Sequence, residues 1–190
     1  MLDPVLLRIA KTAVMEEFDS QYRIEKAQLL QKYPFLAKKA ATFVTLNKEK
    51  ELRGCIGSVI AYRSLLDDLV SNAKSAAFSD PRFQPLDNTE LESLEVEVSV
   101  LSQPQPIEYK DIGDLVAQIV PKKDGLILRY AQFQGTFLPQ VWEQIPNVEM
   151  FLEHLSYKAG GDPTIYRYHP EILRYRVEHI SEAWNAILPI

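Results

Sequence analysis

The chain contains a single cysteine, Cys55, so no disulfide can form within it and no CxxC pair is present to begin a zinc site. None of its three histidines stands at a zinc-site spacing from that cysteine. No run of about 18 apolar residues, the length that a membrane-spanning helix requires, is present. The expected N-terminal helix carries charges instead of an apolar signal segment. We therefore predict no metal site, no membrane span and a reducing, cytoplasmic location.

The common nucleotide-binding and hydrolase motifs are missing as well. There is no phosphate-binding loop, no dinucleotide fingerprint and no GxSxG elbow, so no cofactor is predicted. A formal net charge of −5 and a pI near 5.3 exclude the broadly basic surface with which proteins wrap nucleic acid. A local basic groove is compatible with this charge.

The composition is that of a folded globular protein, with 46% hydrophobic and 25% charged residues. A length of 190 residues fits one domain, because single cores typically hold about 100 to 200 residues. The segment Gln-Pro-Gln-Pro at 103–106 is a stiff connector. We therefore predict a single domain over residues 1–190, with a lobe boundary near 102–106.

Periodicity and end signals predict a series of helices and strands. Apolar residues at three- and four-residue spacing predict helices over 4–18, 23–32, 65–77, 111–120 and 147–159. Alternating and β-branched runs predict strands over 41–46, 52–60, 94–100, 126–133, 135–138 and 172–177. Because the strands come mostly as hairpins with helices between them, we predict an α+β fold with a mainly antiparallel sheet and flanking helices.

The clearest strand is the segment 94–100, in which apolar and polar residues alternate strictly. Its apolar side chains face one way, and Glu95, Glu97 and Ser99 face the other. A carboxylate beside a hydroxyl can orient or deprotonate a substrate group, so Glu97 and Ser99 are candidate site residues. A solvated strand face explains the same pattern.

The segment Leu-Arg-Gly-Cys-Ile-Gly-Ser at 52–58 places the only cysteine between two glycines. Positive charge or oriented N–H groups convert a thiol into a nucleophilic thiolate. Arg53 shares a face with Cys55 in a regular strand, so it can stabilise the thiolate or hold an anionic substrate. Gly54 and Gly57 can let a ligand approach the backbone. Alternatively, Cys55 fills the core with its apolar neighbours.

Three more polar residues lie close to the end of the helix 65–77 or just beyond it. Asp80 and Arg82 flank a proline and can pair with one another or with Arg53, which would hold this loop over the hairpin. Asn72 is the polar residue of a helix end rich in small side chains. It can bond the glycine turn or satisfy buried backbone.

Lys158 and His154 are four residues apart on the helix 147–159, so they share one face and each can take part in proton transfer. Two exposed charges on a helix would look the same. Trp142, together with Phe137 and Pro139, is expected to pack in the core rather than to stack on bases.

Several short words of the sequence occur in the same order in one known family. They are LRGCIG at 52–57, NA at 72–73, AAFSDPRF at 76–83, EVSVL at 97–101 and TFLPQVW at 136–142. The chain resembles the AMMECR family, named for the Alport syndrome, mental retardation, midface hypoplasia and elliptocytosis chromosomal region. The resemblance covers about residues 41–158 and implies a two-lobed α+β fold with a site at the LRGCIG word. Glu97 lies in the EVSVL word, and Lys158 begins the KAG word.

The resemblance also implies a cellular context, since AMMECR-type domains accompany or are fused to Memo-type and radical-SAM proteins. One hypothesis is a small intracellular enzyme, or a component of one, that modifies a protein or nucleic acid, with Cys55 and Glu97 as catalytic residues. The other is a non-catalytic module that binds a peptide, a nucleotide or a partner protein. The expected substrate-binding residues are Arg53, Gly54, Gly57, Asn72, Asp80, Arg82, Ser99 and Lys158.

Overall fold

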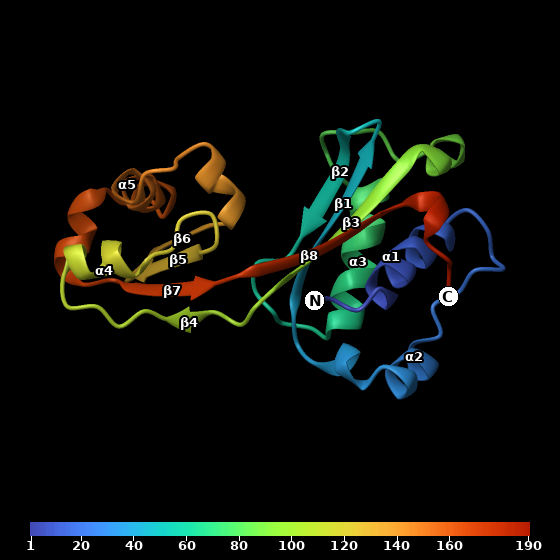
Figure 1. The fold of residues 1–190 in the computed structure, drawn as a ribbon, viewed down its shortest axis with the longest axis horizontal. Coiled ribbons are helices and arrows are strands. Elements are labelled where there is room, and N and C mark those ends of the chain that lie inside the picture. Colours follow the sequence, from blue (N-terminus) through green and yellow to red (C-terminus); the bar gives the residue numbers. More distant parts are fainter. The chain divides into compact units, whose positions relative to one another are not determined.

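The chain runs from one structural unit into a second and back again in the computed structural model, which describes residues 1–190. Unit 1 comprises residues 1–101 and 178–190, and unit 2 comprises residues 102–177. Both ends of the chain therefore belong to unit 1 (Figure 1). The return of the chain to unit 1 at residues 177–178 was not predicted from the sequence. None of the helices combines the length and the apolar character needed to cross a bilayer.

Unit 1 is built on a four-stranded sheet in the order β2-β1-β3-β8. Its strands are β1 (Ala41–Lys48), β2 (Glu51–Gly57), β3 (Leu94–Leu101) and β8 (Val177–Ala183). β1 pairs antiparallel with both β2 and β3, so the predicted hairpin and the predicted alternating strand are confirmed. β2 ends at Gly57 rather than near residue 60, and the hydroxyl of the next residue, Ser58, donates to Asp68 in the following helix (2.8 Å).

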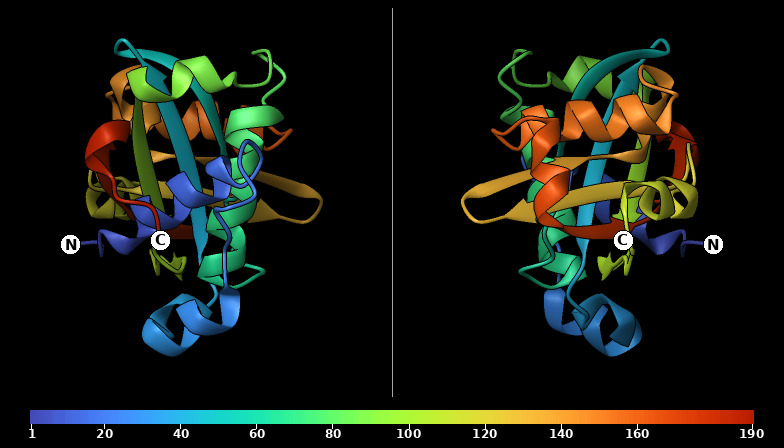
Figure 2. Two further views of the ribbon diagram at one scale, coloured as in Figure 1. Left: turned by 90° about the vertical axis from the view of Figure 1, so that its right-hand side faces the viewer. Right: turned by 90° about the vertical axis from the view of Figure 1, so that its left-hand side faces the viewer.

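Helices cover one face of this sheet. The helices of unit 1 are α1 (Val5–Met15), α2 (Lys26–Lys32) and α3 (Leu65–Phe78), with short 3-10 turns η1 (Pro34–Ala37), η2 (Asn88–Ser93) and η5 (Trp184–Ala186). α1 and α3 lie side by side against the strands (Figures 1 and 2), and Val44 and Val98, both 0% exposed, point toward them. The opposite face of the sheet, here called the far face, therefore carries the alternate residues of β1, β2 and β3.

Two predicted helix starts in unit 1 are confirmed by their caps. The carboxylate of Asp3 accepts a hydrogen bond from the Val5 N–H (2.9 Å), and the Ser64 hydroxyl accepts one from the Asp67 N–H (3.1 Å). Two helix bounds differ from the prediction. α1 ends at Met15, before residue 18, and α2 begins only at Lys26, because the preceding residues form separate turns.

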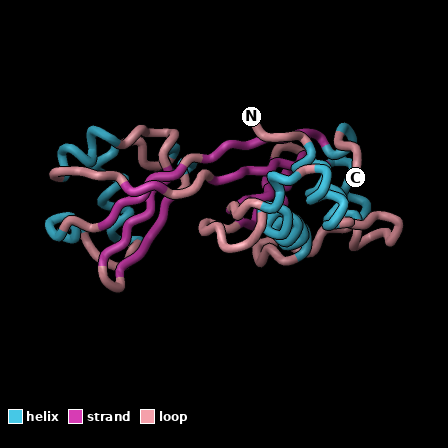
Figure 3. Tube along the Cα trace, turned by 90° about the horizontal axis from the view of Figure 1, so that it is seen from below, coloured by secondary structure: helices cyan, strands magenta, loops and turns pink.

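Unit 2 contains a second four-stranded sheet, in the order β4-β7-β5-β6. Its elements are β4 (Gln105–Pro106), α4 (Ile112–Gln118), β5 (Gly125–Tyr130), β6 (Phe133–Phe137), η3 (Pro139–Glu143), α5 (Val148–Lys158), η4 (Pro163–Tyr168) and β7 (Glu171–Tyr175). Figure 3 distinguishes its strands from the helices of the same unit. The carboxamide of Asn147 caps α5 by accepting from the Met150 N–H (2.9 Å), and Gly160 follows the helix with φ of +92°, so the predicted start and stop are confirmed.

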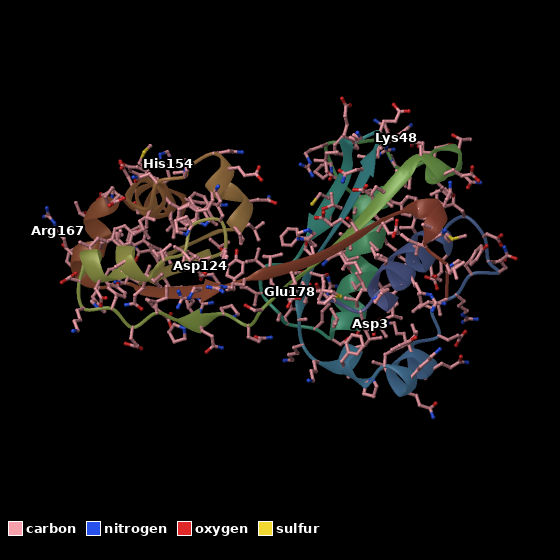
Figure 4. All side chains as sticks on the ribbon, in the orientation of Figure 1. Asp3, Lys48, Asp124, His154, Arg167 and Glu178 are labelled. Atoms are coloured by element: carbon pink, nitrogen blue, oxygen red, sulfur yellow. The ribbon has the colours of Figure 1, made fainter.

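The core of unit 2 is centred on Trp142, which is 1% exposed and stacks on Phe151 with ring centroids 3.7 Å apart. Its indole N–H donates to the backbone oxygen of Asp124 (2.8 Å). The buried carboxylate of Asp124, labelled in Figure 4, accepts from Arg174 (3.3 Å) and Arg176 (3.2 Å). Trp142 therefore packs in the core, as expected.

Candidate functional site

The far face of the unit 1 sheet brings the two expected catalytic residues into one row. Thr45 of β1 stands opposite Cys55 of β2 on one side and opposite Glu97 of β3 on the other. The Thr45 hydroxyl donates a hydrogen bond to the Cys55 sulfur at 3.2 Å. All three side chains are partly exposed. Cys55 and Glu97, the two expected catalytic residues, therefore share a face, and Thr45 stands between them.

The backbone of Cys55 is held from outside the sheet by Asp80 and Arg82. β2 is an edge strand, and at Cys55 its N–H and C=O point away from β1. The N–H donates to the Asp80 carboxylate (2.9 Å), and the C=O accepts from the Arg82 guanidinium (3.2 Å). Asp80 and Arg82 thus bond the edge where a further strand would pair. We call this pair the thiol clamp.

The two residues of the thiol clamp are bonded to one another at three points. Arg82 donates to Asp80 from its backbone N–H (3.1 Å), from Nε (3.0 Å) and from Nη2 (2.7 Å). This hydrogen bonding from Arg82 holds the pKa of Asp80 well below its usual range, although burial of the carboxylate acts in the opposite direction. The Asp80 side chain is 2% exposed. Of the two pairings considered from the sequence, the structure therefore contains the one between Asp80 and Arg82.

Arg53 is not the partner of Cys55. It is the extra residue of a bulge, since Leu46 pairs with Gly54 and Asn47 with Leu52. Its guanidinium donates to both carboxylate oxygens of Glu90, at 3.0 and 2.8 Å.

The expectation that regular strand spacing sets Arg53 beside the sulfur was therefore wrong. The bulge interrupts that spacing, and the guanidinium is bound elsewhere.

Glu90 forms ion pairs with two cations, Arg53 and Lys48, at the tip of the β1–β2 hairpin. Lys48, labelled in Figure 4, donates to the same carboxylate (3.0 Å). The hydrogen bonds from Arg53, and secondarily from Lys48, lower the pKa of Glu90 to about 2, against the effect of burial. Sequence reasoning missed this residue. Its signal was its position three residues after Asp87, because the two complete the capping box of η2.

The two glycines of the LRGCIG segment serve packing. A Cβ on Gly54 would lie 2.1 Å from the backbone oxygen of Ala76 in α3, so only glycine lets β2 approach that helix. A Cβ on Gly57 would lie 2.3 Å from the ring of Phe43. The space that was expected to admit a ligand is filled by protein atoms at both positions.

Asn72 belongs to a buried polar network below the sheet. It is 3% exposed and donates to the backbone oxygen of Thr42 (3.0 Å), so it satisfies buried backbone, the second of the two expected roles. Asp68, which is 0% exposed, accepts from the Thr42 N–H (2.8 Å), the Ser58 hydroxyl (2.8 Å) and Arg63 (2.7 Å). Asp68 was not anticipated. The sequence feature that could have indicated Asp68 is its four-residue spacing to Asn72, which puts both residues on one face of α3.

The remaining expected site residues lie at different places. Ser99 stands opposite Phe43, one row along the far face from Glu97, so these two share a face as predicted. Lys158 belongs to unit 2, where its ammonium lies 5.0 Å from the centroid of the Phe137 ring. His154 lies near Tyr157 of the same helix, with ring centroids 6.4 Å apart. The Cys55 row receives neither Lys158 nor His154 from its own unit.

The charges around the row are unevenly satisfied. Glu97 forms no ion pair, whereas Asp80 is bonded by Arg82 at both oxygens. Arg82 is 54% exposed, and its Nη1 donates no hydrogen bond within the protein. Hydrogen bonding to Asp80 raises the pKa of Arg82, against its own desolvation, and the charges of Asp80 and Cys55 raise it further. The site therefore offers a thiol, an unpaired carboxylate and a guanidinium with one free nitrogen.

Fold and site together define an α+β protein of two units with a thiol on the far face of the first sheet. The model of the AMMECR1 family matches residues 7–180. The chain belongs to this family.

Relatives and a solved structure agree with that assignment. A protein of Saccharolobus islandicus strain L.S.2.15 is 42% identical over 165 residues, which cover 83% of this chain and 71% of the relative. A protein of Methanothermobacter thermautotrophicus is 36% identical over 178 residues, covering 91% and 89%. The crystal structure of the uncharacterized protein PH0010 from Pyrococcus horikoshii has a TM-score of 0.75 and 32% identity, with 94% of this chain and 90% of that chain covered. The fold predicted from the sequence is confirmed.

Proposed function

We propose that the protein is a small cytoplasmic enzyme, or a component of one, that transfers a group to or from a macromolecule through the Cys55 thiol. The observation that supports this most is the row of Cys55, Thr45 and Glu97 on one sheet face. Cys55 is partly exposed, and its sulfur accepts a hydrogen bond from the Thr45 hydroxyl. Proteins of the Memo and radical-SAM types are the partners we propose from the family resemblance.

In this proposal Glu97 acts on the substrate rather than on the sulfur. Two strand spacings separate Glu97 from Cys55, which amounts to about 10 Å. That distance is too long for a proton to pass directly from Cys55 to Glu97. A substrate that spans Thr45 can reach both, with its reacting carbon at the sulfur and a more distant hydrogen-bond donor at the carboxylate, so that Glu97 orients the substrate.

The covalent step is an acyl transfer. The Cys55 thiolate attacks the carbonyl carbon of the substrate and forms a thioester, and the leaving group departs with a proton taken from water. An acceptor nucleophile then attacks the thioester, gives its proton to water, and the thiolate is released. Arg82, which holds Cys55 through its backbone oxygen, is a positioning residue whose free Nη1 can bind the oxygen of the substrate carbonyl.

A non-catalytic recognition module is the second candidate, favoured by a specific observation. The hydrogen bond from Thr45 and the thiol clamp give Cys55 a complete structural role without any reaction. In that case the far face binds a peptide, a nucleotide or a partner protein, and the sulfur is only a packing group.

The rate of thiol alkylation separates the two. At about pH 6 a free cysteine, with a pKa of about 8.5, is almost entirely protonated. At this pH, Cys55 of the native protein should react with iodoacetamide at least several times faster than the thiol of glutathione does. Thr45→Val should slow the reaction of Cys55, because the hydrogen bond to its sulfur is lost. Thr136→Val, at a threonine of unit 2, is the matched control. A Cys55 that stays inert until the protein is denatured would contradict the catalytic proposal.

A further inference from the structure

We propose that unit 2 carries a docking pocket for a peptide segment of a partner protein, which inserts an apolar side chain and places a basic residue beside α5. This proposal does not rest on the chemistry proposed for Cys55, since every residue that it uses belongs to unit 2.

The pocket has a volume of about 510 Å³ and lies between the start of α4, the outer side of α5 and η4. Ligand-binding pockets commonly measure about 300–1,000 Å³. Its apolar wall consists of Ile112, Val116, Leu152, Pro163 and Tyr166. Leu152 is 2% exposed, and the Tyr166 hydroxyl is bonded to the Leu152 backbone oxygen, so this wall is held in place. A large apolar side chain fits such a cavity.

A stacked pair of rings forms another wall. The rings of Tyr109 and His169 are 4.1 Å apart and 9° from parallel. His169 has φ of +52°, the left-handed region that non-glycine residues rarely adopt. Its Nε2 lies 2.8 Å from the Tyr109 backbone oxygen, and because a carbonyl can only accept, Nε2 carries the hydrogen. Nδ1 forms no hydrogen bond within the protein. The wall is therefore preorganised and polar at one atom.

The charges of the lining are separated. On α5, Glu149 and Glu153 are one helical turn apart, both line the pocket, and neither forms an ion pair. The two lining cations, Lys110 and Arg167, come from outside α5. Arg167, labelled in Figure 4, interacts with the charge of Asp162. A ligand with its positive charge toward α5 therefore meets two carboxylates that form no ion pair, and no cation of α5 lines the pocket.

An exposed apolar side chain at the cavity favours a peptide over a small molecule. Ile112 lines the pocket and is 48% exposed. Exposed apolar side chains that adjoin a pocket are typical of protein-binding surfaces. An extended peptide can bury one side chain in the pocket and cover this rim with its neighbours.

Nuclear magnetic resonance titration with defined peptides tests the proposal. The probes are acetyl-Lys-Trp-Lys-amide, its acidic counterpart acetyl-Glu-Trp-Glu-amide, and free indole. The basic peptide should shift the amide signals of Leu152 and Tyr166 saturably, about tenfold more tightly than the acidic peptide. The double variant Glu149→Gln, Glu153→Gln should reduce that preference about three- to tenfold, since each exposed charge contributes modestly. Glu143→Gln, an exposed acid outside the pocket lining, is the control and should leave it unchanged.

A second variant keeps the test independent of charge. Ile112→Ser removes a half-exposed apolar side chain and should weaken both peptides by the same factor, several-fold, without changing the preference. Equal affinity for the two peptides would overturn the proposal, as would indole binding as tightly as the basic peptide, which would indicate a small apolar ligand. Pocket shifts that depend on protein concentration alone would overturn it too, because the occupant would be a second copy.

Discussion

Two ion pairs of similar geometry hold the LRGCIG strand, one at Cys55 and one at Arg53. At Cys55, Arg82 is bonded to Asp80, and this pair binds both backbone groups of the cysteine. At Arg53, the guanidinium is bonded to Glu90, with Lys48 as a second cation, and we call this group the hairpin clamp. Only the thiol clamp touches the cysteine.

The comparison shows that an arginine close to a cysteine in sequence need not be the one that serves it. Arg53 is two residues from Cys55, yet its side chain is committed to Glu90. Arg82 is separated from Cys55 by 27 positions and bonds its backbone. The ring of Phe83 lies between the two groups, 5.9 Å from the Arg53 guanidinium and 5.5 Å from that of Arg82. The two clamps are therefore neighbours, and each can be broken separately.

The largest effect is expected from Gly54→Ala, which lies between the clamps. The new Cβ would meet the Ala76 backbone oxygen at 2.1 Å, so β2 or α3 must shift, at a cost of about 2–3 kcal/mol in the free energy of unfolding. Urea unfolding measures this. Gly161→Ala is the control, since its Cβ would have no neighbour closer than 3.5 Å and should change stability by less than about 0.5 kcal/mol. Equal stability of the two variants would show that β2 is not held tightly against α3.

A smaller effect, confined to the thiol clamp, is expected from Asp80→Asn. This change removes the charge that binds Arg82 and weakens the hydrogen bond from the Cys55 N–H, so we expect a loss of about 2 kcal/mol. The alkylation rate of Cys55 should change several-fold at the same time, because its backbone is released. Glu90→Gln is the matched change at the hairpin clamp and should leave that rate within about twofold. If both variants alter the rate equally, the two clamps act as one.

Local signals in the sequence were sufficient for most of the elements. Ser64 and Asn147 marked helix starts, Gly160 marked a helix end, and strict alternation from Leu94 gave β3 with its correct faces. Each of these depends on neighbours within a few residues, which a sequence displays directly. The shared face of Glu97 and Ser99 followed from the strand period in the same way.

The sequence could not show what depends on distant contacts. The bond between Arg53 and Glu90 joins residues 37 positions apart, and nothing local distinguishes it from a bond between Arg53 and the thiol. β8 was not predicted, because the strand expected over 172–177 corresponds to β7 and the segment 178–183 is largely polar, with Ile180 as its only large apolar residue packed on the core of unit 1. An edge strand of that kind is identified by its partner β3 rather than by its own pattern. The role of Gly54 likewise required the position of α3.

The smallest effect is the dependence of stability on acid at the hairpin clamp. The pKa of Glu90 is lowered to about 2 in the folded protein, from a reference value of 4.5. A carboxylate with a depressed folded pKa contributes stability above its unfolded pKa, and that contribution is lost as the pH falls from about 4.5 to about 2. Because Glu90 is partly exposed, we expect roughly 1 kcal/mol from this group. Urea unfolding at a series of pH values measures this. As the pH is lowered, the free energy of unfolding should fall less steeply in Glu90→Gln than in the parent.

Asp80→Asn provides the contrast in the same measurement. Its folded pKa is also depressed, so the parent loses the contribution of Asp80 at still lower pH than that of Glu90. As the pH is lowered, the curve of the free energy of unfolding against pH should meet that of the parent first for Glu90→Gln. The curve for Asp80→Asn should meet it only at lower pH. If both curves meet that of the parent at one common pH, the two carboxylates titrate as a coupled pair. The division into a thiol clamp and a hairpin clamp would then describe the hydrogen bonds but not the electrostatics.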